Sequence, residues 1–190
     1  MKPIQLYAIF FTFLFAFTLN GWAQTTYRIA EESKMVIKGT STLHDWESKV
    51  TELEGEAQIE MKGQQPHFQQ VTLTVPVKSI KSEYEAMDTN TFNALQEEEY
   101  PTIQFTLNEI ESISEKEIKA TGDLTVAGNT QPIAVSVEYE MTAPDQISLK
   151  GSHALKMTDF GIEPPTAVFG TIETSDEITV DYTLQLSAAN

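Results

Sequence analysis

Apolar and polar residues alternate along most of the chain after residue 30, in runs long enough to form β-strands. In the run 117–126 the odd positions are charged or hydroxylated, whereas the even positions are apolar residues or glycine. The runs 133–141 and 178–186 show the same alternation. A period of two is typical of a strand with one apolar and one solvated face. Because little helix is available to cover them, these strands are expected to pack on each other or to close into a barrel.

Three segments interrupt the alternation. One short helix is predicted near residues 87–97, where Asp88 or Thr89 can cap its N-terminus. This helix is too small to cover a sheet, but it can cover the open end of a barrel. The clearest hairpin has Gly128-Asn129 as its turn, since both residues tolerate a positive φ. The stretch 159–170 contains two prolines and is expected to form a loop packed over one end of the barrel.

The first 23 residues have the layout of a secretory signal peptide. Lys2 supplies a positive end, residues 6–19 form an uncharged and mostly apolar run, and the segment 21–23 supplies small residues before a cut at Gln24. The alternatives are a membrane anchor or a buried hairpin, but a spanning helix needs about 20 apolar residues. We therefore expect residues 1–23 to be a signal peptide and residues 24–190 to form one soluble domain, either periplasmic or secreted.

The composition of the chain excludes several classes of ligand and catalytic site. The formal net charge is −16, and such a surface repels phosphate backbones, so nucleic acid is not expected as a partner. The chain contains no cysteine, which excludes disulfides, thiol catalysis and cysteine-ligated zinc. Its three histidines, His44, His67 and His153, stand at no metal-ligand spacing. No metal and no other cofactor is therefore predicted.

Two histidines nevertheless need an interpretation. His44 is next to Asp45, but adjacent residues on a strand point to opposite faces, so they form no catalytic relay unless the backbone turns there. A structural or ligand-binding role is therefore preferred, and no catalytic residue is assigned. His153 shares a strand face with Leu149 and Leu155. It is either a partly buried histidine that bonds the backbone or a polar group that meets a ligand head inside a cavity.

Four segments, taken in order, resemble the YceI family of exported lipid-binding proteins. They are residues 35–46, residues 87–105 with the sequence Glu-Tyr-Pro-Thr-Ile-Gln-Phe at their end, the hairpin 121–133, and residues 156–162. The resemblance implies an all-β fold, an extended and lipocalin-like antiparallel β-barrel of about eight strands. It also implies that a long isoprenoid or another amphiphile threads the barrel.

One position departs from the family pattern. Members often carry Arg-Asp just before the short helix, where this chain has Met87-Asp88. If that arginine holds an anionic head in relatives, its absence here favours a neutral head, such as a quinone or an alcohol, over a pyrophosphate.

Inward-facing apolar side chains of such a barrel form the candidate cavity wall. These are Ile37, Leu73, Val75, Phe105, Leu124, Val126, Val135, Val137, Leu155 and Leu184. Candidates for the mouth or the head-group site are mostly in irregular segments. These are His44, Trp46, Phe92, His153, Phe160 and Phe169.

The leading hypothesis is a soluble exported carrier or store for an isoprenoid-type or other amphiphilic lipid, with no covalent chemistry. One alternative is a stress-related interaction protein whose barrel is filled by its own side chains. A less favoured alternative is an enzyme that acts on a lipid in the barrel through His44 and Asp45 or Asp88. A homodimer is compatible with all three hypotheses.

Overall fold

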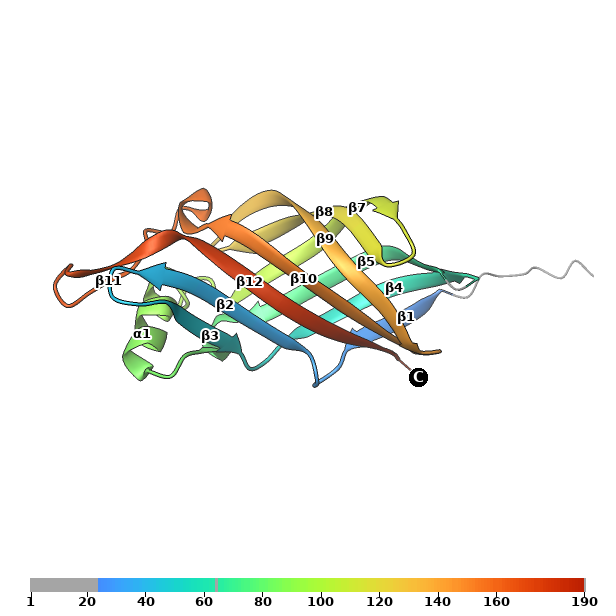
Figure 1. Cartoon of the computed structure of the whole chain (residues 1–190), viewed down its shortest axis with the longest axis horizontal. Coiled ribbons are helices and arrows are strands. Elements are labelled where there is room, and N and C mark those ends of the chain that lie inside the picture. Colours follow the sequence, from blue (N-terminus) through green and yellow to red (C-terminus); the bar gives the residue numbers. More distant parts are fainter. Residues whose placement is uncertain (1–23, 64, 190) are drawn as a thin grey trace, which may run out of the picture.

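The computed structural model describes residues 24–63 and 65–189 (Figure 1). The predicted signal peptide, residues 1–23, lies outside the described residues. Within these described residues the chain forms twelve strands, one α-helix and two short 3-10 helices. The all-β prediction is confirmed.

Eight of the strands close into a barrel. Each pairs with its neighbours in antiparallel fashion, and the pairing of the first strand with the last closes the ring. In order around the ring, these strands are β1 (Thr25–Ile29), β4 (Glu54–Lys62), β5 (Gln65–Pro76), β7 (Thr102–Ile113), β8 (Glu117–Val126), β9 (Asn129–Ala143), β10 (Gln146–Lys156) and β12 (Ile172–Ala188). The predicted eight-stranded antiparallel barrel is therefore confirmed.

The other strands extend the wall at one end. β12 is 17 residues long, so its C-terminal part pairs with β1 while its middle pairs with β2 (Lys34–Ser41). β3 (Trp46–Val50) and β6 (Ile80–Lys81) continue this sheet, and a 3-10 turn, η1 (Val77–Ser79), joins β5 to β6. A short strand, β11 (Thr166–Ala167), pairs with the start of β12. Figure 1 shows α1 (Glu85–Ala94) and β11 at this end and the C-terminus at the other.

The helix begins and ends earlier than the sequence pattern predicts. It covers Glu85–Ala94 rather than 87–97. It ends before 97 because Gln96 takes a positive φ of 52° and the chain turns there. The predicted caps are also wrong. Tyr84 occupies the N-cap position without a side-chain hydrogen bond, and the Asp88 carboxylate accepts hydrogen bonds from Ser82 instead.

The predicted hairpin exists, but its turn is shifted by one residue. Val126 pairs with Asn129, so the two turn residues are Ala127 and Gly128, with φ of 46° and 74°. Positive φ at both positions is the pattern of a tight hairpin turn. The Asn129 side chain donates to the carbonyl of Phe160 at 2.8 Å, which fixes it to η2 (Met157–Phe160).

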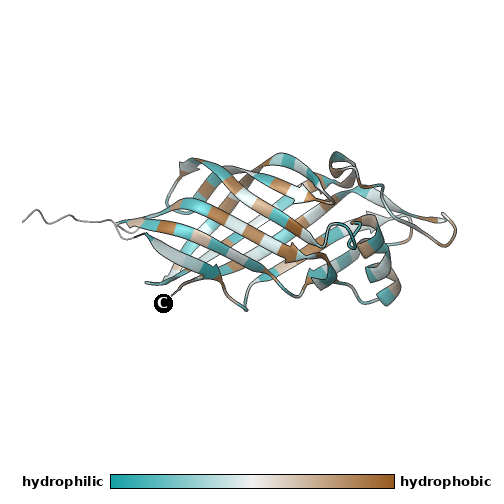
Figure 2. Cartoon of the chain, turned by 180° about the vertical axis from the view of Figure 1, so that it is seen from behind, coloured by the Kyte–Doolittle hydropathy of each residue, from teal (hydrophilic) through white to brown (hydrophobic). Residues whose placement is uncertain are grey.

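Inward side chains pack the barrel unevenly along its length. Figure 2 shows apolar and polar residues alternating along the strands. A large buried cluster occupies the end where β1 meets β12, and it includes Tyr27, Ile59, Tyr139, Ile147 and Leu186. Smaller buried clusters line the other end, around Met157 and Phe160 and around Met35 and Ile80. The β1 end therefore holds the largest of the buried clusters.

Candidate functional site

An apolar cavity of about 580 Å³ occupies the inside of the barrel. Its lining comes from the barrel strands together with β2, β3, α1, η2 and β11. This volume lies within the range of roughly 300–1,000 Å³ that is usual for small-molecule pockets. Three of the lining residues at the α1 end are Leu43 in the β2–β3 loop, Tyr84 just before α1, and Ala167 in β11. Leu43 and Tyr84 are also exposed to solvent, so the mouth of the cavity lies between these three elements.

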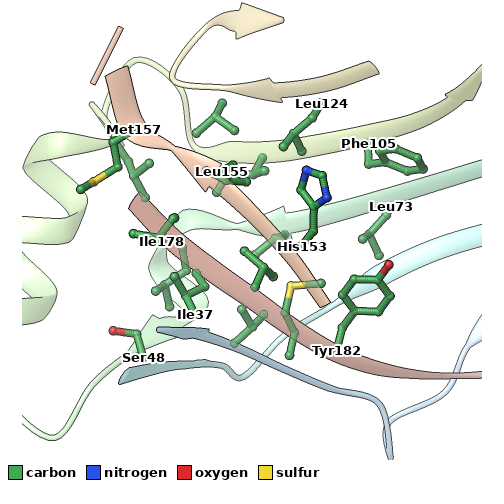
Figure 3. A pocket seen from close by; sticks show the side chains of 18 of the residues that line it. Ile37, Ser48, Leu73, Phe105, Leu124, His153, Leu155, Met157, Ile178 and Tyr182 are labelled. Carbon is green, nitrogen blue, oxygen red and sulfur yellow. The ribbon is translucent and has the colours of Figure 1, made fainter. Parts of the chain in front are cut away.

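All ten predicted wall residues line this cavity. They lie on β2, β5, β7, β8, β9, β10 and β12, at the alternate positions of each strand whose side chains face inward. Ile37, Leu73, Phe105, Leu124 and Leu155 are among the side chains drawn in Figure 3. That these side chains contact a lipid remains a prediction.

Four of the six predicted mouth or head-group residues also line the cavity. His44, Trp46 and Phe160 line it from segments near the mouth, whereas His153 lies on the wall strand β10. Phe160, the last residue of η2, is buried in a cluster with Met157 and Ile162, so its contribution is to close the wall. The long loop thus packs over one end of the barrel through Phe160 and Ile162, as the sequence predicts.

The remaining two residues, Phe92 and Phe169, are not part of the lining. Phe92 lies on α1 with the Lys81 ammonium 4.8 Å from its ring centre, an arrangement that attracts a cation to an aromatic face. Phe169 stands fully exposed in the turn between β11 and β12. Phe92 was a candidate for the mouth, but its ring faces Lys81 on β6 instead of the cavity.

Exposed large apolar side chains gather around the mouth. Among the described residues they are Leu43, Tyr84, Val168 and Phe169. Leu43 and Tyr84 also line the cavity, and the other two follow Ala167, which lines it as well. Val168 and Phe169 take positive φ values of 50° and 54°, which are unusual for a β-branched and a bulky residue. The rim of the cavity is thus apolar on its outer side too.

The lining is almost uncharged. It contains no lysine or arginine within the described chain, and its one carboxylate, Glu56, is bound by Arg28 at 3.0 Å. Met87 also lines the cavity from α1. No positive side chain is therefore available there to neutralise an anionic head.

His44 is not oriented by a carboxylate. Its Nδ1 lies 2.7 Å from the backbone carbonyl oxygen of Asp45, and the Ser41 hydroxyl bonds the backbone carbonyl of His44. The β2–β3 loop is therefore held by local bonds of its own. This geometry gives no relay between the His44 and Asp45 side chains.

Two further polar side chains lie on the wall. His153 projects from β10 and Tyr182 from β12, and Figure 3 shows both among apolar side chains. Burial lowers the pKa of the His153 imidazole and raises the pKa of the Tyr182 hydroxyl. Both groups are consequently neutral near pH 7. Sequence reasoning missed Tyr182 as a site residue, although a hydroxyl in the inward run 178–186 was a usable signal.

Neither a metal centre nor a spanning helix is found in the part of the chain that the structure describes. In residues 24–63 and 65–189 no three His, Asp or Glu side chains come together in a way that could hold a metal ion. In the same residues no helix has the length and apolar character needed to cross a membrane.

Solved structures with a similar fold agree with this architecture. A polyisoprenoid binding domain from Saccharophagus degradans is 14% identical with a TM-score of 0.68, over 87% of this chain and 99% of that chain. The YCEI protein of Campylobacter jejuni is 22% identical with a TM-score of 0.59, over 72% of this chain and 81% of that chain. At these identities the likeness shows the fold alone.

Sequence comparison gives the family. A UPF0312 protein of Pseudomonas putida is 25% identical over 115 residues, which are 57% of this chain and 60% of the relative. The matched segment thus spans less than two thirds of that relative. The sequence model of the YceI-like domain matches residues 27–186, almost the whole of the barrel. The chain therefore belongs to the YceI-like domain family.

Proposed function

We propose that this protein is an exported carrier or store that binds a long isoprenoid-type or other amphiphilic lipid inside its barrel, without covalent chemistry. The observation that carries the proposal is the apolar cavity of about 580 Å³, which opens at one end between α1 and β11. Burial of a lipid tail contributes about 0.8 kcal/mol per CH₂ group. A tail of modest length therefore binds at about micromolar strength after the costs of ordering.

Two other findings support a lipid ligand. One solved structure of the same fold is described as a polyisoprenoid binding domain. In addition, the exposed side chains of Leu43 and Phe169 give the mouth an apolar rim. A lipid tail that leaves a bilayer can contact this rim before it enters the cavity, so less of the tail is exposed to water. Export, to the periplasm or beyond, rests on the signal-peptide pattern in residues 1–23.

A filled barrel fits the structure less well. The alternative of an interaction protein requires a packed interior throughout. Dense packing is present at the β1 end, around Ile59 and Ile147, but the α1 end holds the cavity. Binding of a ligand is therefore the better explanation of this interior.

Charge placed on the cavity wall tests the proposal. Val135 lines the cavity, whereas its neighbour Ala134 is exposed on the outer face of β9. Val135→Asp puts a carboxylate in an apolar lumen and is expected to abolish lipid retention, because an unpaired buried charge is strongly disfavoured. Ala134→Asp adds the same charge outside and should leave lipid retention unchanged.

Both variants are purified without detergent, and extracted lipid is quantified by mass spectrometry. Val135→Trp, which fills the lumen without a charge, is the second test in case Val135→Asp does not fold. Lipid retained at the wild-type level by a folded Val135 variant would place the binding site elsewhere.

A further inference from the structure

We propose that His153 and Tyr182 form a hydrogen-bonding site inside the lumen for an uncharged oxygen atom of the ligand, a carbonyl or a hydroxyl. This inference rests on the proposed lipid-binding function and deepens it. It makes the cargo a lipid with a neutral oxygen-bearing head, and it puts that oxygen on the wall of the barrel, not on its rim.

The strand register brings these two side chains together. On β10 and β12, Gly151 pairs with Tyr182 and His153 pairs with Val180. His153 and Tyr182 are therefore diagonal neighbours on the same inward face, and such neighbours lie about 7–8 Å apart at the backbone, within reach of long side chains. Figure 3 shows both projecting into the cavity.

Gly151 holds the tyrosine in this position. A Cβ atom at residue 151 would overlap the hydroxyl oxygen and the adjoining ring carbons of Tyr182. The absence of that Cβ lets the phenol lie against β10, with its hydroxyl over Gly151 and two residues from His153. A glycine at the position opposite the tyrosine thus leaves room for the phenol against β10, two residues along the strand from His153.

Neither group has a hydrogen-bond partner in the described part of the chain. Within residues 24–63 and 65–189, no side-chain hydrogen bond is made by His153 or Tyr182. In the same residues no buried side-chain nitrogen or oxygen is sealed off without a partner, so the unbonded atoms of these two residues are open to the cavity. A polar group without a hydrogen-bond partner is disfavoured in an apolar environment. A ligand oxygen supplies the missing partner.

The charge state decides which oxygen fits. Since burial lowers the pKa of His153 and raises the pKa of Tyr182, both groups are neutral and offer N–H and O–H donors. The lining within the described chain has no lysine or arginine, and Glu56 is bound by Arg28. A phosphate in this lumen would be stripped of water without a countercharge, which is strongly unfavourable. A carbonyl or hydroxyl oxygen can accept hydrogen bonds from the two donors without the desolvation of a charge.

Matched probes and variants test the site. Residues 24–190, which contain every strand of the barrel, are titrated with geranylgeraniol, with geranylgeranyl phosphate and with phytane, a branched hydrocarbon of similar length. Tyr182→Phe and His153→Leu remove one donor each and keep the apolar volume. Thr183→Val is the matched control, because it removes a hydroxyl from the outward face of the same strand.

The expected result is a loss of about three- to tenfold in affinity for geranylgeraniol in each of the two lumen variants. Affinity for phytane should be unchanged in all variants, and the wild type should prefer the alcohol to the phosphate. Equal losses for the alcohol and the hydrocarbon, or no loss for either, would overturn the polar site while leaving lipid binding intact. A wild-type protein that binds none of the three probes would overturn both this site and the proposed function.

Discussion

At the scale of single residues, glycines opposite aromatic rings keep the lumen open. Gly39 is covered by Trp46, Gly151 by Tyr182, and Gly122 by the ring of Phe105. In each case the large side chain lies against the wall, in the space that a Cβ would have filled. The alternation along one strand does not reveal these pairs, because the aromatic side chain comes from the neighbouring strand.

Two of these glycines should respond differently to alanine. A Cβ at Gly122 meets the Phe105 ring and also the Thr106 carbonyl oxygen at 2.7 Å, which belongs to the backbone and cannot swing away. At Gly151 the nearest atoms all belong to the mobile end of Tyr182. Gly122→Ala should therefore lower the free energy of unfolding by about 1–3 kcal/mol, and Gly151→Ala by less. Urea denaturation of both variants checks the order, and a larger loss for Gly151→Ala would contradict it.

At the scale of elements, α1 is tied to the barrel through Asp88. Its carboxylate accepts bonds from the Ser82 backbone N–H and hydroxyl, both at 2.7 Å, and lies 3.6 Å from the Lys81 ammonium. Burial alone would raise the pKa of Asp88, but the Ser82 bonds and the Lys81 charge together lower it below 3.8. The stabilisation is therefore present above that pH and is lost as the pH falls through the lower pKa of the folded state.

Removal of this carboxylate should loosen the helix at the mouth. Asp88→Ala is expected to cost about 1.5–3 kcal/mol near neutral pH, because hydrogen bonds to a charged group are lost. Glu85→Ala is the matched control, since Glu85 is an exposed acidic residue in the first turn of the same helix. Urea denaturation near neutral pH compares the two. Equal stability of both variants would show that Asp88 does not anchor α1.

Element boundaries were predicted less well than element types, for reasons visible in the structure. The alternation of apolar residues identified the strands, but the helix begins at Glu85 because Ser82 and Asp88 form a bonded junction that no local pattern reveals. Likewise, the hairpin turn is Ala127-Gly128 rather than Gly128-Asn129, because Asn129 is needed to bond Phe160. Both shifts involve side-chain hydrogen bonds that the alternation of apolar and polar residues does not predict.

At the scale of the whole molecule, one barrel is packed at one end and hollow at the other. Alternation predicted all ten wall positions, yet it could not separate packed from open regions, because the same residue types occur in both. Ile147 is fully buried in the packed cluster, whereas Leu124 lines the cavity, and both lie in similar inward runs. The difference comes from the large side chains that meet at the β1 end, such as Tyr27 and Tyr139.

The most direct test of the lipid-carrier account is native mass spectrometry of the protein from its own cells, purified without detergent and followed by organic extraction. The account predicts a mass above that of residues 24–190 by one lipid, and an extracted lipid with a long apolar tail and an uncharged oxygen-bearing head. It also predicts that the Val135→Asp protein carries no lipid. A clean protein mass, with no uptake of added isoprenoid alcohols or quinones, would contradict the carrier function and favour a protein that acts through its surface.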